Sequence, residues 1–167
     1  GSRNITISGS DIGPCGVDSP TRSCHYPALA TGGCEGLGVL VADSSAVELS
    51  DSYIHSEYRP TNQSFDPKDR RWSHGIDRGD SIFVTNSHSV LVAGCVVAFG
   101  ESNLENHAST DVTVEGNFFL NPLGPAPRGN QVQTWGDPEH CMPQSGGSEA
   151  KCNSRNTAVR FNVALTC

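Results

Sequence analysis

The sequence has few basic residues, few aromatic residues and a single methionine. Eleven Lys and Arg stand against 18 Asp and Glu, and the formal net charge of −7 argues against a nucleic-acid partner, which needs a basic face. No apolar run approaches the roughly 20 residues of a membrane-spanning helix, so no membrane span is expected. No window shows sustained 3.6-residue periodicity, and 18 Gly and 10 Pro favour tight turns. An all-β domain is therefore expected.

A short pattern recurs along the chain. It has an apolar residue, a second apolar residue two positions later, a small residue, a turn residue and a further apolar residue. The four copies are SRNITISGSDIG, SSAVELSDSYIHS, SHSVLVAGCVVAFG and STDVTVEGNFFL. Their first apolar positions are Ile5, Val47, Val90 and Val112, and their turn positions hold Ser10, Ser52, Cys95 and Asn117. The alternation predicts one half-buried strand per copy.

A second strand recurs ahead of the first one. Val39, Ile82 and Leu104 each lie 8 positions before the aligned valine of their copy, and Val90 and Val112 are 22 positions apart. A period near 20 residues made of short strands and turns is typical of a solenoid, in which each coil buries its apolar face against its neighbours.

The repeat divides the 167 residues into about five coils of one domain, with loops inserted between strands. The coils are expected at 5–12, 39–54, 82–97, 104–119 and, more loosely, 132–161. The inserts are expected at 13–38, 55–81, 120–131 and 136–154. The first three inserts are expected to extend from one corner of the solenoid, and the last insert from a different corner. Loops on a rigid scaffold commonly carry binding sites. The chain reads as a single β-helix domain or as a segment of a longer one.

Seven cysteines favour an oxidising, extracellular setting, because loops without a core of their own gain most from disulfides. The sequence leaves open which cysteines pair in disulfides. Zinc binding is not favoured, because the sequence contains no Cys-x-x-Cys pair. Cys95 stands at a turn position of the repeat and is expected to be a free thiol. Glycosylation sequons begin at Asn4 and Asn62, which agrees with a secreted glycoprotein.

The coil DSIFVTNSHSVLVAGCVVAFG, followed by STDVTVEGNFF, resembles the right-handed parallel β-helix of the pectin-lyase-like superfamily. The segment NPLGPAPRGNQVQTW is similar to a stretch of right-handed β-helix repeat proteins. The resemblance implies a right-handed parallel β-helix and a secreted protein that acts on, or binds, polysaccharide. The superfamily includes lyases, hydrolases and non-enzymes, so the resemblance leaves open whether bonds are cut.

Within that resemblance, a lyase acting on acidic polysaccharide is favoured over a glycoside hydrolase. HGIDRGDS is similar to the Asp-Gly-x-Asp stretch of polygalacturonases, but the adjacent Asp pair expected one coil later is missing. A lyase needs a base and a cation beside the substrate carboxylate. Calcium is a candidate cofactor, with Asp77, Asp80, Glu101 and Glu105 as oxygen ligands. The catalytic candidates are His74, Asp77, Arg78, Asp80 and Arg128.

The insert at 55–81 offers a way to hold a sugar. Its stretch DPKDRRW places an aromatic ring beside basic groups, an arrangement that stacks on and binds sugar rings. The substrate-binding candidates are Lys68, Arg70, Arg71 and Trp72. A plain solvated loop explains the same residues. His88 and His107 lie near turns and are expected to be exposed.

The alternative function is structural. A solenoid whose end coils are open exposes strand edges and apolar surface, and such ends can stack on another copy. The sequence therefore also predicts end-to-end self-association into filaments, with the loops as decoration.

Overall fold

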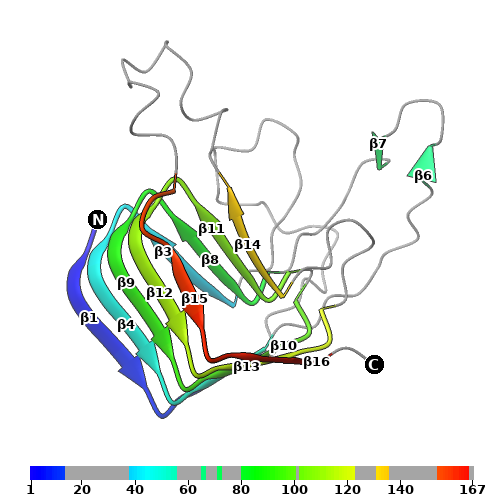
Figure 1. The fold of residues 1–167 in the computed structure, drawn as a ribbon, viewed down its shortest axis with the longest axis horizontal. Helices are drawn as coiled ribbons and strands as arrows, with labels where there is room; N and C mark the ends of the chain where they lie inside the picture. The colour runs from blue at the N-terminus through cyan, green and yellow to red at the C-terminus, as the bar shows by residue number, and fades with distance from the viewer. Residues whose placement is uncertain are drawn as a thin grey trace, which may run out of the picture.

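The computed structural model describes residues 1–13, 38–55, 80–100, 102–122, 131–134 and 154–165, together with the backbone of 65–66, 71–72 and 135. All regular structure in these residues is β-structure. Three sheets are wholly parallel, and none closes into a barrel. Figure 1 shows them as three walls around a common interior.

The strands of sheet A, in spatial order, are β1 (Arg3–Ser8), β4 (Ser45–Ser50), β9 (His88–Ala93), β12 (Thr110–Glu115) and β15 (Ala158–Arg160). Sheet B contains β2 (Asp11–Ile12), β5 (Tyr53–His55), β10 (Val96–Ala98), β13 (Phe118–Leu120) and β16 (Val163–Leu165). Sheet C contains β3 (Val39–Ala42), β8 (Ile82–Thr85), β11 (Leu104–His107) and β14 (Val132–Trp135). A separate antiparallel pair joins β6 (Phe65–Asp66) to β7 (Arg71–Trp72).

The chain visits the sheets in the fixed order C, A, B, and each passage through them is one coil. The pairing registers match the sequence repeat: Ile5 pairs with Val47, Val47 with Val90 and Val90 with Val112. Leu104 pairs with Ile82, as the second repeated strand predicts. The parallel all-β architecture is confirmed, and it is compatible with a β-helix.

The interior is formed by the apolar position of each coil lying on the same position of the next. Leu49, Val92 and Val114 form one such row in sheet A, and all three are fully buried. Ile54, Val97 and Phe119 form the matching row in sheet B. Each such side chain contributes roughly 1.5–3 kcal/mol through its burial. A coil alone could not bury these residues, so neighbouring coils stabilise one another.

Sheet A bends at the same position in each of its strands. Its five residues at that position have positive φ angles between 52° and 55°: Asn4, Ala46, Ser89, Asp111 and Asn156. Asn and Asp tolerate this left-handed conformation better than Ala does. The repeat therefore specifies the backbone conformation as well as the burial pattern.

Hydroxyl groups stack at the corner between sheets C and A. The Ser2, Ser44 and Ser87 N–H groups donate to the hydroxyl of the serine one coil further on, at 3.3, 3.0 and 3.1 Å. These acceptors are Ser44, Ser87 and Ser109, and each donates its own hydroxyl to the carbonyl two residues earlier. The ladder satisfies backbone groups that a turn would otherwise leave unpaired.

The corner between sheets A and B uses the predicted turn residues in the same way. The Ser10 N–H donates to the Ser52 hydroxyl at 3.1 Å, and the Cys95 N–H donates to Asn117 Oδ1 at 2.8 Å. Cys95 is a free, buried thiol, as predicted, and burial is the main cause that raises its pKa above the ordinary 9.0. The cysteines expected to form disulfides, and most of the four inserts, lie outside the described residues.

Candidate functional site

The outer face of sheet C carries the main cluster of polar side chains that the fold does not require. Glu105 and His107 are two residues apart on β11, so both point outward while Leu104 and Asn106 point into the interior. Glu105 Oε2 lies 3.0 Å from His107 Nε2. The pair is largely enclosed, with 11% of the Glu105 side chain and 19% of the His107 side chain exposed.

Two groups hold this pair in place. The Ser102 hydroxyl donates to Glu105 Oε1 at 3.0 Å, so each carboxylate oxygen has a partner. The Phe83 ring on the neighbouring strand β8 lies against the His107 ring, with centroids 4.8 Å apart and planes tilted by 56°. The hydrogen bond and the ring contact together restrict the imidazole to one orientation.

Asp80 belongs to the same cluster through Ser102. It is buried, and its Oδ1 accepts the Ser102 backbone N–H at 3.0 Å. Asp80 therefore anchors the turn that presents the Ser102 hydroxyl to Glu105. In the described residues its contact is with backbone, which assigns it a positioning role in the cluster.

A carboxylate that holds an imidazole is chemically equipped for proton transfer. The carboxylate fixes the orientation of the ring and stabilises its positive charge after the ring accepts a proton. Such general base catalysis requires the base to reach its substrate, and the exposed part of His107 supplies the access. The arrangement fits proton abstraction more directly than paired-carboxylate hydrolysis, because Glu105 bonds the histidine while Asp80, the second acid of the cluster, bonds the Ser102 backbone N–H.

The structure brings only part of the predicted site into view. Asp80 is described with its side chain, whereas Arg71 and Trp72 are described only as the backbone of β7, paired with Asp66 and Phe65. The remaining candidates lie outside the described residues: His74, Asp77, Arg78, Arg128, Lys68 and Arg70. All six lie in connections that lead from a strand of sheet B to the next strand of sheet C, and the first of these connections also contains the β6–β7 pair.

His107 corrects one sequence expectation. Exposure was predicted for His88 and His107, and only His88 is exposed. His107 is partly buried because the spacing Glu105-x-His107 puts both side chains on one face of a strand, where they bond to each other. That two-residue spacing was the available signal, since strand residues i and i+2 share a face.

The described part of the chain contains no group of three or more His, Cys, Asp or Glu side chains arranged to hold a metal ion. Two of the candidate calcium ligands, Asp77 and Glu101, lie outside it. Glu105 and Asp80, the other two, bond to Ser102 at different groups, its hydroxyl and its backbone N–H.

The chain matches no known family model, no curated protein and no solved structure. In the part of the chain that the structure describes, no helix is long and apolar enough to cross a membrane.

Proposed function

We propose that the protein is an extracellular, right-handed parallel β-helix of the pectin-lyase-like type that acts as a lyase on an acidic polysaccharide. The observation that carries this proposal is the enclosed Glu105–His107 pair on the outer face of sheet C. Structural demands explain the inward residues of β11, but they do not explain a hydrogen-bonded acid and histidine on its outward face.

The proposed chemistry is β-elimination. His107 removes the proton on the carbon next to the sugar carboxylate. The electron pair forms a double bond to the neighbouring ring carbon as the bond from that carbon to the glycosidic oxygen breaks, and the leaving oxygen takes a proton from water. Glu105 stabilises the imidazolium formed in this step. A positive group near the substrate carboxylate favours the elimination, because negative charge builds up there in the transition state. Arg78 and Arg128 are the residues proposed for that task.

The inserts supply the proposed means of holding the sugar. Lys68, Arg70, Arg71 and Trp72 lie between a strand of sheet B and a strand of sheet C in the chain, as does Arg128. An aromatic ring among basic side chains suits a sugar that carries carboxylates. His74 and Asp77, from the same insert as Arg78, remain candidate members of the site.

The test is the absorbance of unsaturated uronides while the purified protein is incubated with pectate, alginate or glycosaminoglycan, with and without calcium. His107→Gln and Glu105→Gln are expected to lower turnover about 100-fold or more, the usual effect of removing an acid-base group. Arg78→Ala and Arg128→Ala are expected to lower it as well.

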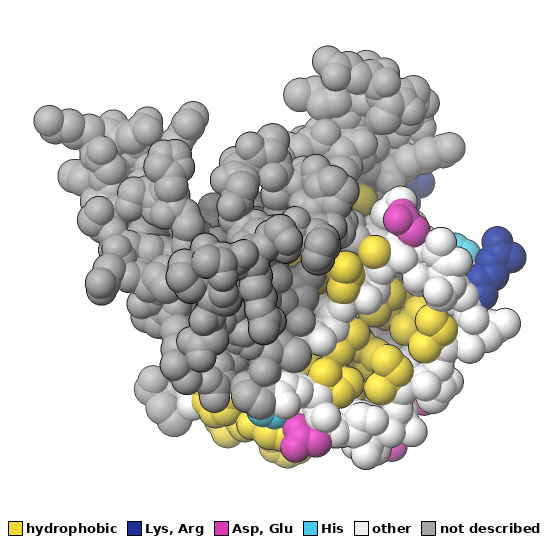
Figure 2. All heavy atoms as spheres, turned by 180° about the vertical axis from the view of Figure 1, so that it is seen from behind, with side chains coloured by type: hydrophobic (Ala, Val, Ile, Leu, Met, Phe, Trp, Pro, Cys, Tyr) yellow, Lys and Arg dark blue, Asp and Glu magenta, His cyan; other side chains and the backbone are white. Residues whose placement is uncertain are grey.

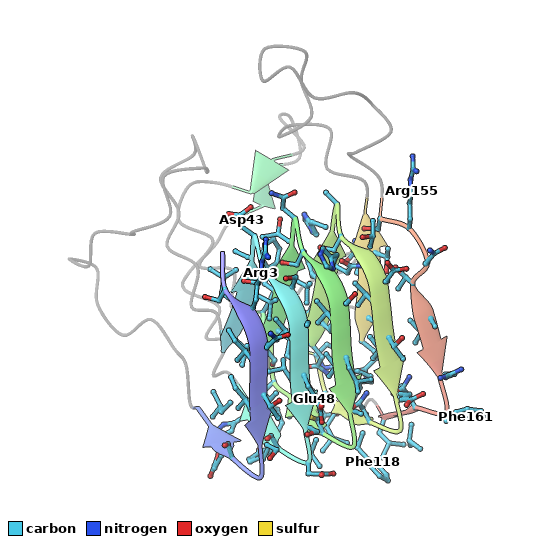
Figure 3. All side chains as sticks on the ribbon, turned by 90° about the vertical axis from the view of Figure 1, so that its left-hand side faces the viewer. Arg3, Asp43, Glu48, Phe118, Arg155 and Phe161 are labelled. Atoms are coloured by element: carbon cyan, nitrogen blue, oxygen red, sulfur yellow. The ribbon has the colours of Figure 1, made fainter. Side chains whose placement is uncertain are left out.

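Glu48→Gln is the matched control. Glu48 Oε1 accepts the Ser50 hydroxyl at 3.0 Å, as Glu105 Oε1 accepts that of Ser102, but Glu48 lies on sheet A (Figure 3). The turnover of the Glu48→Gln variant should stay within about twofold of that of the unsubstituted protein, since no reacting group is removed. Circular dichroism checks that each variant is folded. A flat absorbance trace with every substrate, or equal losses in the Glu48 and Glu105 variants, would refute the lyase proposal.

The two ends of the described stack favour a second candidate, a structural unit that stacks end to end. At the N-terminal end, apolar side chains are open to view (Figure 2). The first coil contains Ile5, Ile7 and Ile12, which are partly buried. At the other end, Val159 pairs with the buried Val114 and is itself 50% exposed. A second copy whose first coil covered Val159 would remove both surfaces from water.

Sedimentation over a range of protein concentrations tests the stacking unit. Oligomers that grow with concentration and disappear in Val159→Asp would support it, provided that circular dichroism shows the variant folded. A monomer at all concentrations would refute it. The lyase assay is independent of this result.

A further inference from the structure

Basic and hydroxyl side chains alternate across the N-terminal ends of the strands of sheet A, on the side of the sheet that adjoins sheet C. Successive register partners along this side are Arg3, Ser45, His88, Thr110 and Arg155. Arg3, His88 and Arg155 are exposed, while Ser45 and Thr110 are partly buried. Figure 3 shows Arg3 and Arg155 on the same side of the sheet, on its first and last coils. We call these five residues the basic row.

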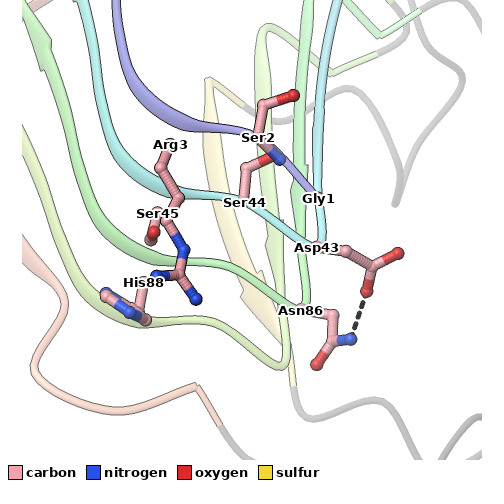
Figure 4. A pocket seen from close by; sticks show the side chains of 8 residues that line it. All are labelled: Gly1, Ser2, Arg3, Asp43, Ser44, Ser45, Asn86 and His88. Carbon is pink, nitrogen blue, oxygen red and sulfur yellow. Dashed lines mark hydrogen bonds between the residues drawn. The ribbon is translucent and has the colours of Figure 1, made fainter.

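A hollow of about 300 Å³ opens at one end of the basic row. It is lined by Gly1, Ser2, Arg3, Asp43, Ser44, Ser45, Asn86 and His88. In Figure 4 the Arg3 side chain extends past Ser45 toward His88, while Asp43 and Asn86 lie on the opposite side. The hollow therefore has a basic side lined with hydroxyls.

The acids next to the basic row are bonded to amides. The Asn86 side chain donates to Asp43 Oδ1 (Figure 4), and the Asn156 side chain donates to Asp111 Oδ1 at 2.9 Å. In the described residues, neither Arg3 nor Arg155 forms an ion pair, although Arg160 Nε bonds Glu115 Oε2 at 2.7 Å. Within the described part of the chain, two guanidinium groups thus have no carboxylate partner, although the net charge of the chain is −7.

The spacing of the row matches an alternating polymer. Neighbouring strands lie about 4.8 Å apart, so basic side chains on every second coil repeat at about 10 Å. Two pyranose rings span a similar length, so a polysaccharide with an anionic group on alternate sugars presents its charges at this interval. The phosphates of a nucleic-acid strand are spaced more closely, and the net charge of −7 repels such a polymer.

We propose that the basic row binds an acidic polysaccharide that lies along the stack, with carboxylate or sulfate groups at Arg3, His88 and Arg155. This inference rests on the proposed function and deepens it by naming the charge spacing of the substrate. The row also passes the candidate site, because only Ala108 and Ser109 separate His107 from Thr110. The Asn86 N–H, which lines the same corner, donates to the His107 carbonyl at 3.1 Å. A polymer bound along the row thus passes the corner at which β11, the strand of Glu105 and His107, leads into sheet A.

The test measures binding of four fluorescent probes by polarisation. They are an oligogalacturonate, in which every sugar carries a carboxylate; a hyaluronan oligosaccharide, in which alternate sugars carry one; a neutral dextran oligosaccharide; and a single-stranded DNA oligonucleotide. Arg3→Gln combined with Arg155→Gln removes the ends of the row, and His88→Arg fixes a charge at its centre. Arg160→Gln is the matched control, since Arg160 lies on sheet A and already has Glu115 as its partner.

The double variant is expected to bind the hyaluronan probe about 5- to 20-fold more weakly, as the loss of two exposed charge contacts predicts. His88→Arg should bind it more tightly, and Arg160→Gln should change affinity by less than about twofold. Binding should weaken as salt is added, and the neutral probe should be insensitive to all variants. Preference for the hyaluronan probe over the oligogalacturonate distinguishes alternate from continuous charge and supports the spacing.

Three results would overturn the proposal: no binding of either acidic oligosaccharide, equal losses in the double variant and Arg160→Gln, or DNA binding as tight as that of the oligosaccharides. Kinetic constants distinguish the failure of the lyase proposal from the failure of the binding proposal. In a working lyase, the double variant should raise KM with kcat retained, whereas His107→Gln should lower kcat with probe binding retained.

Discussion

Two corners of the coil differ in how much the length of their connections varies from coil to coil. At the corner between sheets A and B, every coil turns with two residues: 9–10, 51–52, 94–95, 116–117 and 161–162. At the corner between sheets B and C, the connections range from 99–103 to 13–38 and 56–81. The first corner repeats without variation, and the second carries the inserts.

Hydrogen bonding explains why the first corner is invariant. Its turn side chains bond to the preceding coil, as Asn117 does through Oδ1 to the Cys95 N–H and through Nδ2 to the Val92 carbonyl. One extra residue would shift the side chain and leave these buried groups unpaired, which is costly. The comparison shows that variation in length between coils occurs outside this turn.

The largest expected effect on stability comes from Asn117→Ala. Asn117 is fully buried, and its side chain also bonds Asn162 Oδ1 at 3.0 Å. The substitution leaves buried backbone groups without partners, so the free energy of unfolding should fall by about 2–4 kcal/mol. Urea denaturation measures it. Ser10→Ala, at the partly exposed start of the same ladder, should cost less than about 1 kcal/mol. Equal losses would show that the ladder does not stabilise the corner.

A smaller effect on stability is expected from substitution of the positive-φ residue of the same turn. Gly116 has φ of 65°, and a Cβ there would meet only the Gly94 nitrogen, at 3.9 Å. Gly116→Ala should therefore lose about 1 kcal/mol for conformational reasons alone. Phe161 holds the equivalent position in the last coil with φ of 57° and is 85% exposed, so Phe161→Gly should gain stability. Thermal denaturation measures both. A loss in Phe161→Gly would show that its exposed ring has a stabilising contact.

The smallest expected effect is the pH dependence introduced by Cys95. Burial raises the pKa of its thiol above 9.0, so the folded state keeps the proton better than the unfolded state does. This contribution to stability is fully present below the unfolded pKa and is lost as pH rises through the folded value. Cys95→Ser should remove the decline above pH 9, because a serine hydroxyl does not titrate there and serine already serves this ladder at Ser10 and Ser52. Denaturant midpoints between pH 7 and 10 test it, and an unchanged slope would contradict it.

The repeat predicted more of the fold than of the site. Aligning Ile5, Val47, Val90 and Val112 specified the register of sheet A, because a one-residue slip would move every apolar side chain to the outer face. The site depends on contacts across coils, which a repeat does not encode. Phe83 against His107, and Asp80 behind Ser102, join residues on neighbouring coils through their outward or turn positions.

The sequence by itself determined the strands, their parallel registers and the turn residues, because burial alternation and positive-φ turns are local properties that recur in every coil. Which outward side chains of different coils meet depends on the tertiary structure. Stacking of the coils placed Phe83 against His107 and aligned Arg3, His88 and Arg155 along one side of sheet A. The physical reason is that outward residues are not constrained by the core, so their neighbours follow from how the coils stack.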